Sequence, residues 1–147
     1  MVDKAALRLQ DKVALVTGAG SGFGEGIARK FVAEGARVLV VDVRGDEAER
    51  VAESLGGDAV ARAWRADVSQ SDDVRGMLDA AERLFHAPLD ILVNNAGIGH
   101  KPQPLEGLDE HDFERLYAVN MKAIYLALRE AVPRFKARAP DARGLRG

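Results

Sequence analysis

The fold is decided by VALVTGAGSGFG (residues 13–24), in which a short apolar segment is followed directly by a glycine-rich turn. Short runs of this kind, rich in Val and Leu, are typical of strands buried on both faces of a sheet. After the turn, apolar residues at helical spacing predict a helix over 22–33, and Gly35 is a suitable helix stop. The stretch therefore predicts a strand, a tight turn and a helix in immediate succession.

The same alternation continues along the chain. Further strands are predicted at 37–41, 60–66 and 91–93, and further helices at 46–55, 73–85 (with Ser71 as its N-cap) and 109–135. Strands that alternate with helices indicate a parallel sheet with helices on both faces. We expect one domain over residues 1–136 and an irregular tail, ARAPDARGLRG, over 137–147.

Composition excludes several classes of protein. The chain has 147 residues, 47% hydrophobic and 30% charged, and its 21 basic and 23 acidic residues are well mixed, so no nucleic acid partner is expected. No apolar run approaches the roughly 20 residues that span a bilayer, and Met1–Lys12 lacks the pattern of a signal peptide. We expect a cytoplasmic protein with no membrane partner. Cysteine is absent, and no metal site is expected.

The glycine turn has the chemistry of a phosphate-binding loop. Gly18 permits a tight turn, Gly22 lets a pyrophosphate approach the backbone, and Gly24 allows the helix to pack on the strand. Asp42 ends the second strand, where an acid can accept hydrogen bonds from both hydroxyls of a ribose. Arg44 offers charge to a 2′-phosphate, but Asp42 repels one, so NAD is favoured over NADP. The alternatives are a turn without a ligand and a surface acid.

The spacing T-G-x-x-x-G-x-G resembles the short-chain dehydrogenase/reductase family, as do Asp67-Val68, Asn94-Asn95-Ala96-Gly97 and the Asn120 of Val119-Asn120-Met121-Lys122. The resemblance covers Lys12 to about Phe135. It implies an α/β, Rossmann-like three-layer fold, truncated to about four parallel strands in the order 3-2-1-4. It also implies that the cofactor contacts Thr17, Gly18, Ser21, Gly22, Phe23, Gly24, Asp42, Asp67, Val68, Asn94, Ala96 and Gly97.

The resemblance assigns roles to the later positions. Asp67 contacts the adenine edge with help from the Val68 amide. Asn94 and Asn95 can both satisfy backbone groups at the strand end, and the resemblance assigns this role partly to Asn94. Asn120 is the catalytic candidate, because the family's asparagine helps to hold a water and a lysine in a proton relay. It falls amid the apolar residues of its helix, so its amide needs partners. A helix kink satisfied internally is the alternative.

The family's catalytic serine follows a fifth strand, and its Tyr-x-x-x-Lys lies on the next helix. In this sequence Tyr117 is followed four residues later by Met121, and Tyr125 by Arg129, so neither forms the motif. We therefore expect the cofactor-binding half of an NAD(P)-dependent oxidoreductase, inactive by itself. The full-length enzyme would interconvert an alcohol and a ketone, with a small molecule as substrate. A non-catalytic dinucleotide-binding or interaction module is the alternative. A methyltransferase is a third reading, against which Thr17-Gly18 and the Asn94 tetrapeptide argue.

The expected truncation leaves surface uncovered. The fourth strand should be a bare sheet edge, and the last helix should expose the apolar residues Phe113, Leu116, Tyr117, Met121, Ile124, Tyr125 and Leu128. In the family this helix lies at a subunit interface. We therefore expect a homo-oligomer that forms through the last helix.

Overall fold

The computed structural model describes residues 7–147. Residues 1–6 of the expected domain, which also begin the segment judged not to be a signal peptide, lie outside the described residues. The elements are β1 (Val13–Thr17), α1 (Gly22–Ala33), β2 (Arg37–Asp42), α2 (Gly45–Ser54), β3 (Ala61–Arg65), α3 (Ser71–Phe85), β4 (Ile91–Val93), α4 (Glu110–Tyr117) and α5 (Ala123–Ala137).

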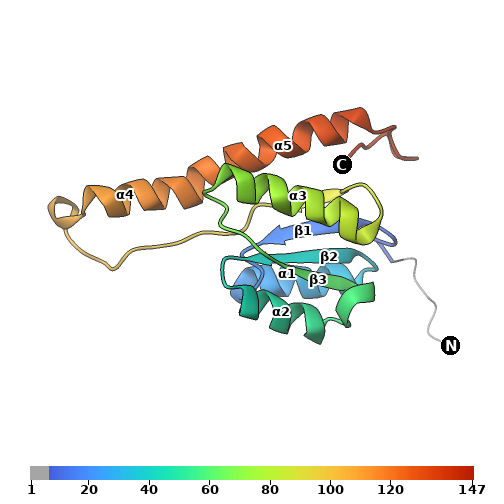
Figure 1. Cartoon of the computed structure of the whole chain (residues 1–147), viewed down its shortest axis with the longest axis horizontal. Coiled ribbons are helices and arrows are strands. Elements are labelled where there is room, and N and C mark those ends of the chain that lie inside the picture. The colour runs from blue at the N-terminus through green and yellow to red at the C-terminus, as the bar shows by residue number, and fades with distance from the viewer. Residues whose placement is uncertain (1–6) are drawn as a thin grey trace.

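The four strands form one parallel sheet in the order β3-β2-β1-β4. Helices α1 and α2 cover one face of it, and α3 and α5 cover the other (Figure 1). The predicted Rossmann-like three-layer architecture and strand order are therefore confirmed.

The central strand β1 is buried on both faces. Val13 and Leu15 pack with α3 and α5, whereas Ala14 and Val16 pack with α1 and α2. Successive side chains of a strand point to opposite faces, so burial of both faces requires an unbroken apolar run. This is the physical reason why residues 13–16 read as a strand in the centre of the sheet.

The predicted N-cap of α3 is wrong. The helix begins at Ser71, so Ser71 is its first residue and Gln70 occupies the cap position. The chain before the helix is turned by Asp67, whose Oδ1 accepts hydrogen bonds from the Ser69 N–H (2.9 Å) and hydroxyl (2.7 Å). Asp73 accepts a hydrogen bond from the Asp67 N–H (2.8 Å). Side chains on both sides of Ser71 thus fix the helix start.

The predicted single helix over 109–135 is divided in the structure. Asp109 is the N-cap of α4, and its side chain accepts a hydrogen bond from the His111 N–H. A π-helical segment, Ala118–Lys122, then joins α4 to α5. Such single-turn π-helical insertions are frequent at functional sites. Asn120 lies inside this segment.

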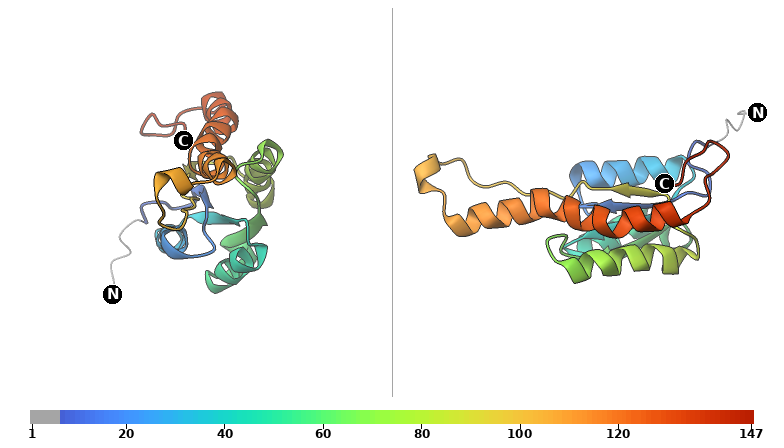
Figure 2. Two further views of the ribbon diagram at one scale, coloured as in Figure 1. Left: turned by 90° about the vertical axis from the view of Figure 1, so that its left-hand side faces the viewer. Right: turned by 90° about the horizontal axis from the view of Figure 1, so that it is seen from above.

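Helix α4 and the loop before it project beyond the sheet (Figure 2). Helix α5 buries Ala123, Leu126, Ala127 and Ala131. The expected apolar stripe is exposed except at Leu116, which is half-buried. Strand β4 lies at the sheet edge and pairs only with β1 in the part of the chain that the structure describes. Within residues 7–147, none of the helices has both the length and the apolar character needed to cross a membrane.

Candidate functional site

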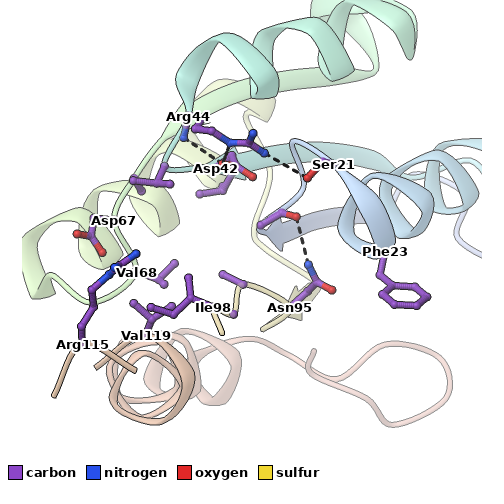
Figure 3. A pocket seen from close by; sticks show the side chains of 16 residues that line it. Ser21, Phe23, Asp42, Arg44, Asp67, Val68, Asn95, Ile98, Arg115 and Val119 are labelled. Carbon is purple, nitrogen blue, oxygen red and sulfur yellow. Dashed lines mark hydrogen bonds and ion pairs between the residues drawn. The ribbon is translucent and has the colours of Figure 1, made fainter. Parts of the chain in front are cut away.

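A pocket of about 500 Å³ opens at the carboxyl ends of the strands (Figure 3). The carboxyl ends of parallel strands meet at one sheet edge, and ligands of such folds bind there, where the strand order reverses. The lining residues come from the ends of the strands and the loops after them, from the start of α1, from α4 and from the π-helical segment. They are Gly18, Ser21, Phe23, Val41, Asp42, Val43, Arg44, Ala66, Asp67, Val68, Asn95, Ala96, Gly97, Ile98, Arg115 and Val119.

The glycine turn forms one wall of this pocket. Gly18 has φ +62° and Gly22 has φ +57°, a backbone conformation that residues with a side chain rarely adopt. A Cβ on Gly24 would collide with the carbonyl oxygen of Gly18, so helix α1 packs directly against the turn. The first N–H groups of a helix have no acceptor within it, and Ser21 makes no side-chain cap bond within the described residues. These N–H groups can donate to a phosphate.

Asp42 is nearly buried at the end of β2 and is 7% exposed. Its Oδ2 accepts a hydrogen bond from the Gly20 N–H (3.0 Å), and its Oδ1 accepts one from the Arg44 N–H (3.0 Å). A carboxylate oxygen has a second lone pair, so each oxygen retains capacity for a ribose hydroxyl. The Arg44 guanidinium donates to the Ser21 hydroxyl (3.2 Å) and lies 3.7 Å from Asp42 Oδ1. It thus bridges the turn and the acid.

Thr17 and Asn95 join the end of β4 to the glycine turn. The buried Thr17 hydroxyl accepts from the N–H groups of Asn95 (3.0 Å) and Ala96 (3.1 Å) and donates to the Val93 carbonyl (3.2 Å). The Asn95 side-chain amide donates to the carbonyls of Thr17 (2.9 Å) and Gly18 (3.2 Å).

The expected backbone role of Asn94 is thereby corrected. Asn95 makes those contacts, whereas Asn94 is exposed and does not line the pocket at the carboxyl ends of the strands. Adjacent residues of extended chain point to opposite sides, so only one of the two asparagines can face β1.

Asp67 and Val68 lie at the end of the pocket opposite Phe23, together with Arg115 (Figure 3). Asp67 and Val68 follow β3, as the sequence predicts. Arg115 was not anticipated, because it comes from α4, and no pattern in the sequence indicates that this helix end reaches the pocket.

The remaining predicted positions differ in location. Gly18, Ser21, Asp42, Ala96 and Gly97 line the pocket, like Phe23, Asp67 and Val68. Thr17, Gly22 and Gly24 belong to the turn or the strand before it but do not line the pocket. Asn95, Val43 and Ile98 line the pocket without having been predicted; each is adjacent to a predicted residue, and that adjacency was the available signal.

Asn120 is satisfied by the loop after β4. Its Oδ1 accepts from the Ile98 N–H (2.9 Å), and its Nδ2 donates to the Ile98 carbonyl (2.9 Å). The partners that the half-buried amide needs therefore come from another segment, and a kink satisfied within the helix is excluded. Because Ile98 lines the pocket, Asn120 holds one wall of the site to the π-helical segment.

We expect Asn120→Ala to lower the free energy of unfolding by about 1–3 kcal/mol, because both backbone groups of Ile98 lose their partner. Denaturant unfolding measures this change. Asn94→Ala is the matched control, since Asn94 is exposed, and we expect less than about 0.5 kcal/mol there. Equal stability of the two variants would contradict the anchoring role of Asn120.

The comparisons with known proteins agree with this geometry. The family model described as short chain dehydrogenase matches residues 12–143. Zerumbone synthase of Zingiber zerumbet is 40% identical over 136 residues, which are 88% of this chain and 50% of that protein. D-threitol dehydrogenase of Mycolicibacterium smegmatis is 41% identical over 120 residues, which are 81% and 45%.

A solved structure is similar as well. It is the 3-ketoacyl-(acyl-carrier-protein) reductase of Brucella melitensis complexed with NADH, with 49% identity and a TM-score of 0.83 over 87% of this chain and 52% of that one. The chain spans about half the length of the relatives it matches. With the fold, the turn and these matches in agreement, the chain belongs to the short-chain dehydrogenase family.

Proposed function

We propose that this chain binds NAD and forms the cofactor-binding half of an oxidoreductase in which hydride moves between the nicotinamide and an alcohol/ketone pair. One observation carries the proposal: Ser21 and Phe23, at the helix start where backbone N–H groups have no acceptor within the helix, line the same pocket as the carboxylate of Asp42. A diphosphate and a ribose are adjacent groups in a dinucleotide, and this pair of features suits them. The NADH bound to the Brucella reductase supports the choice of ligand.

NAD is the proposed cofactor, in preference to NADP. Asp42 is nearly buried, and its carboxylate accepts hydrogen bonds from two backbone N–H groups. The carboxylate therefore cannot move away from a 2′-phosphate without breaking these hydrogen bonds. Arg44 is the opposing feature, but its guanidinium is engaged with Ser21. Titration of the chain with NADH and with NADPH tests the choice, and tighter binding of NADH is the expected result.

The proposed site takes the adenosine and phosphate part of the cofactor. Asp67 and Val68 stand at the end suited to adenine, and Gly18, Ser21 and Phe23 of the glycine turn face the phosphates. Ala96, Gly97 and the Ile98 loop held by Asn120 complete the wall. Relatives named as dehydrogenases and a reductase support hydride transfer as the reaction of a complete protein. We propose that residues 1–147 bind the cofactor without turnover. A non-catalytic dinucleotide-binding module has the same signature for the chain alone.

S-adenosylmethionine is the ligand that separates this proposal from a methyltransferase. Both classes use a glycine-rich turn and a strand-end acid. Binding of S-adenosylmethionine in place of NADH would overturn the proposal.

We also propose self-association through the last helix of the sequence prediction, which comprises α4, the π-helical segment and α5 in the structure. The exposed side chains include Tyr117, Met121, Tyr125 and Leu128, with exposed fractions between 45% and 59%. Full burial of a large apolar side chain contributes roughly 1.5–3 kcal/mol, so several together strongly favour a covered state.

We expect light scattering at micromolar concentration to show a species larger than a monomer. The double change Tyr125→Glu and Leu128→Glu should shift the equilibrium towards monomer, because burial of an unpaired charge in an apolar interface is costly. Leu105→Glu is the matched control, since Leu105 is 83% exposed and lies outside the stripe. A monomeric parent chain would rule out the proposed association.

A further inference from the structure

The peptide groups on either side of Gly20 are held by side chains from the second βα unit. The Gly20 N–H donates to Asp42 Oδ2 (3.0 Å), and the Gly20 carbonyl accepts from Arg50 Nη2 (2.9 Å). A Cβ at Gly20 would lie 2.8 Å from Asp42 Oδ2 and 2.9 Å from the Cβ of Glu47, so any other residue here would force Asp42 or Glu47 to shift. Side chains of β2 and α2, which are distant from the turn in sequence, therefore hold the turn; we call these two contacts the clamp.

Within the clamp, the contact from Arg50 matters because it fixes a peptide group that lies next to a glycine. Glycine adopts either sign of φ at little cost, so a peptide group next to glycine can rotate readily. In a trans peptide the C=O of one residue and the N–H of the next point in opposite directions. Fixing the Gly20 carbonyl on Arg50 thus also fixes the direction of the Ser21 N–H, and Ser21 lines the pocket.

Arg50 is itself held in place from two helices. Its Nε donates to Glu47 Oε2 (2.9 Å) on α2, and its Nη2 donates to Glu25 Oε2 (3.1 Å) on α1. Hydrogen bonds from Arg29 and Arg50 hold the pKa of Glu25 below its ordinary value, so this carboxylate is charged at neutral pH. A planar guanidinium offers several fixed donors, which allows one side chain to join α1, α2 and the turn.

We propose that Arg50 is a positioning residue for the cofactor's phosphates: it locks the Gly20–Ser21 peptide in the orientation that presents N–H groups to the pocket. Arg50 is not among the residues that line the pocket within the described chain, so it acts through the turn. The inference rests on the proposed function and deepens it, because it names the part of the ligand that depends on this residue.

The test compares two arginines of the same ion-pair network. Arg50→Gln removes the donor to Gly20. Arg29→Gln is the matched control, because Arg29 binds the same Glu25 (2.6 Å) and also Ser54 (3.0 Å) but does not touch the turn. The two side chains are similarly exposed, 51% and 44%. NADH fluorescence titration of residues 1–147 gives the dissociation constants, and thermal melts show whether each variant is folded.

We expect Arg50→Gln to weaken NADH binding about tenfold, the effect of losing one hydrogen bond from an N–H of the turn to a charged phosphate. Arg29→Gln should bind NADH within about twofold of the parent. Competition against NADH adds a second readout: ADP should lose affinity as NADH does, whereas adenosine, which lacks phosphates, should not. Arg50→Lys keeps one donor for the Gly20 carbonyl and should recover part of the loss.

Each other outcome counts against the inference. Unchanged NADH affinity in Arg50→Gln overturns it, as does an equal loss in Arg29→Gln. An equal loss for ADP and adenosine would show a general loosening of the domain and also overturns it. If Arg50→Gln does not fold, Arg50→Lys decides by the same ratio of ADP to adenosine. A parent chain that binds no NADH rejects the proposed function, and the inference with it; the parent measurement thus separates the two failures.

Discussion

Replacing Asp42 with alanine is expected to weaken NADH binding by about 1–3 kcal/mol, because ribose hydroxyls are left without their acceptor. The same change leaves the buried Gly20 N–H without a partner, so the free energy of unfolding should also fall by about 1–3 kcal/mol. Calorimetric titration and denaturant unfolding measure the two effects separately. NADH affinity equal to that of the parent would remove Asp42 from the site.

One further variant, Asp42→Asn, separates the effect of the charge of Asp42 from that of its hydrogen bonds. Asp42→Asn keeps an oxygen that can accept from Gly20 but removes the charge, so it should retain more stability than Asp42→Ala. Without the charge, the preference for NADH over NADPH should narrow. Asp46→Ala is the control for a nearby acid, because Asp46 is exposed in the first turn of α2. A preference that stays unchanged in Asp42→Asn would contradict the proposed basis for NAD selection.

Residues 1–147 are expected to catalyse no hydride transfer between NADH and ketones. The sequence contains no Tyr-x-x-x-Lys, so no tyrosine of that motif is present to protonate a developing alkoxide. General acid–base assistance contributes about 10²–10⁴-fold to a rate, and loss of substrate positioning lowers the rate further.

The measurement is the absorbance of NADH with several ketones, on a preparation whose mass confirms residues 1–147. NADH binding is determined on the same sample, so that absence of turnover is not mistaken for absence of folded protein. Oxidation of NADH above the protein-free rate would refute the prediction.

The fold could be predicted from residues 13–24 and the runs that repeat their pattern. An unbroken apolar run such as Val13–Val16 is required only where a strand is covered on both faces, and the intervening helices supply that cover. The glycine turn could also be predicted, because its backbone requires glycine: Gly18 and Gly22 have positive φ, and Gly24 has no room for a side chain.

The contacts that complete the site could not be predicted, because they join segments that are distant in sequence. Asn120 binds Ile98 across 22 residues, and Arg50 binds Gly20 across 30. Local patterns identify which residues are polar and where strands end, but they do not determine which of Asn94 and Asn95 faces β1. They likewise gave no sign of the π-helical turn, which changes the direction of Asn120 relative to a regular helix.

NADH titration of residues 1–147, with ADP as competitor, is the most direct test of the central claim that this chain is a dinucleotide-binding unit. We expect saturable binding of one NADH per chain, displaced by ADP because the residues proposed to contact the adenosine and phosphates line the pocket. Absence of saturable binding, or NADH binding that ADP does not displace, would contradict that claim.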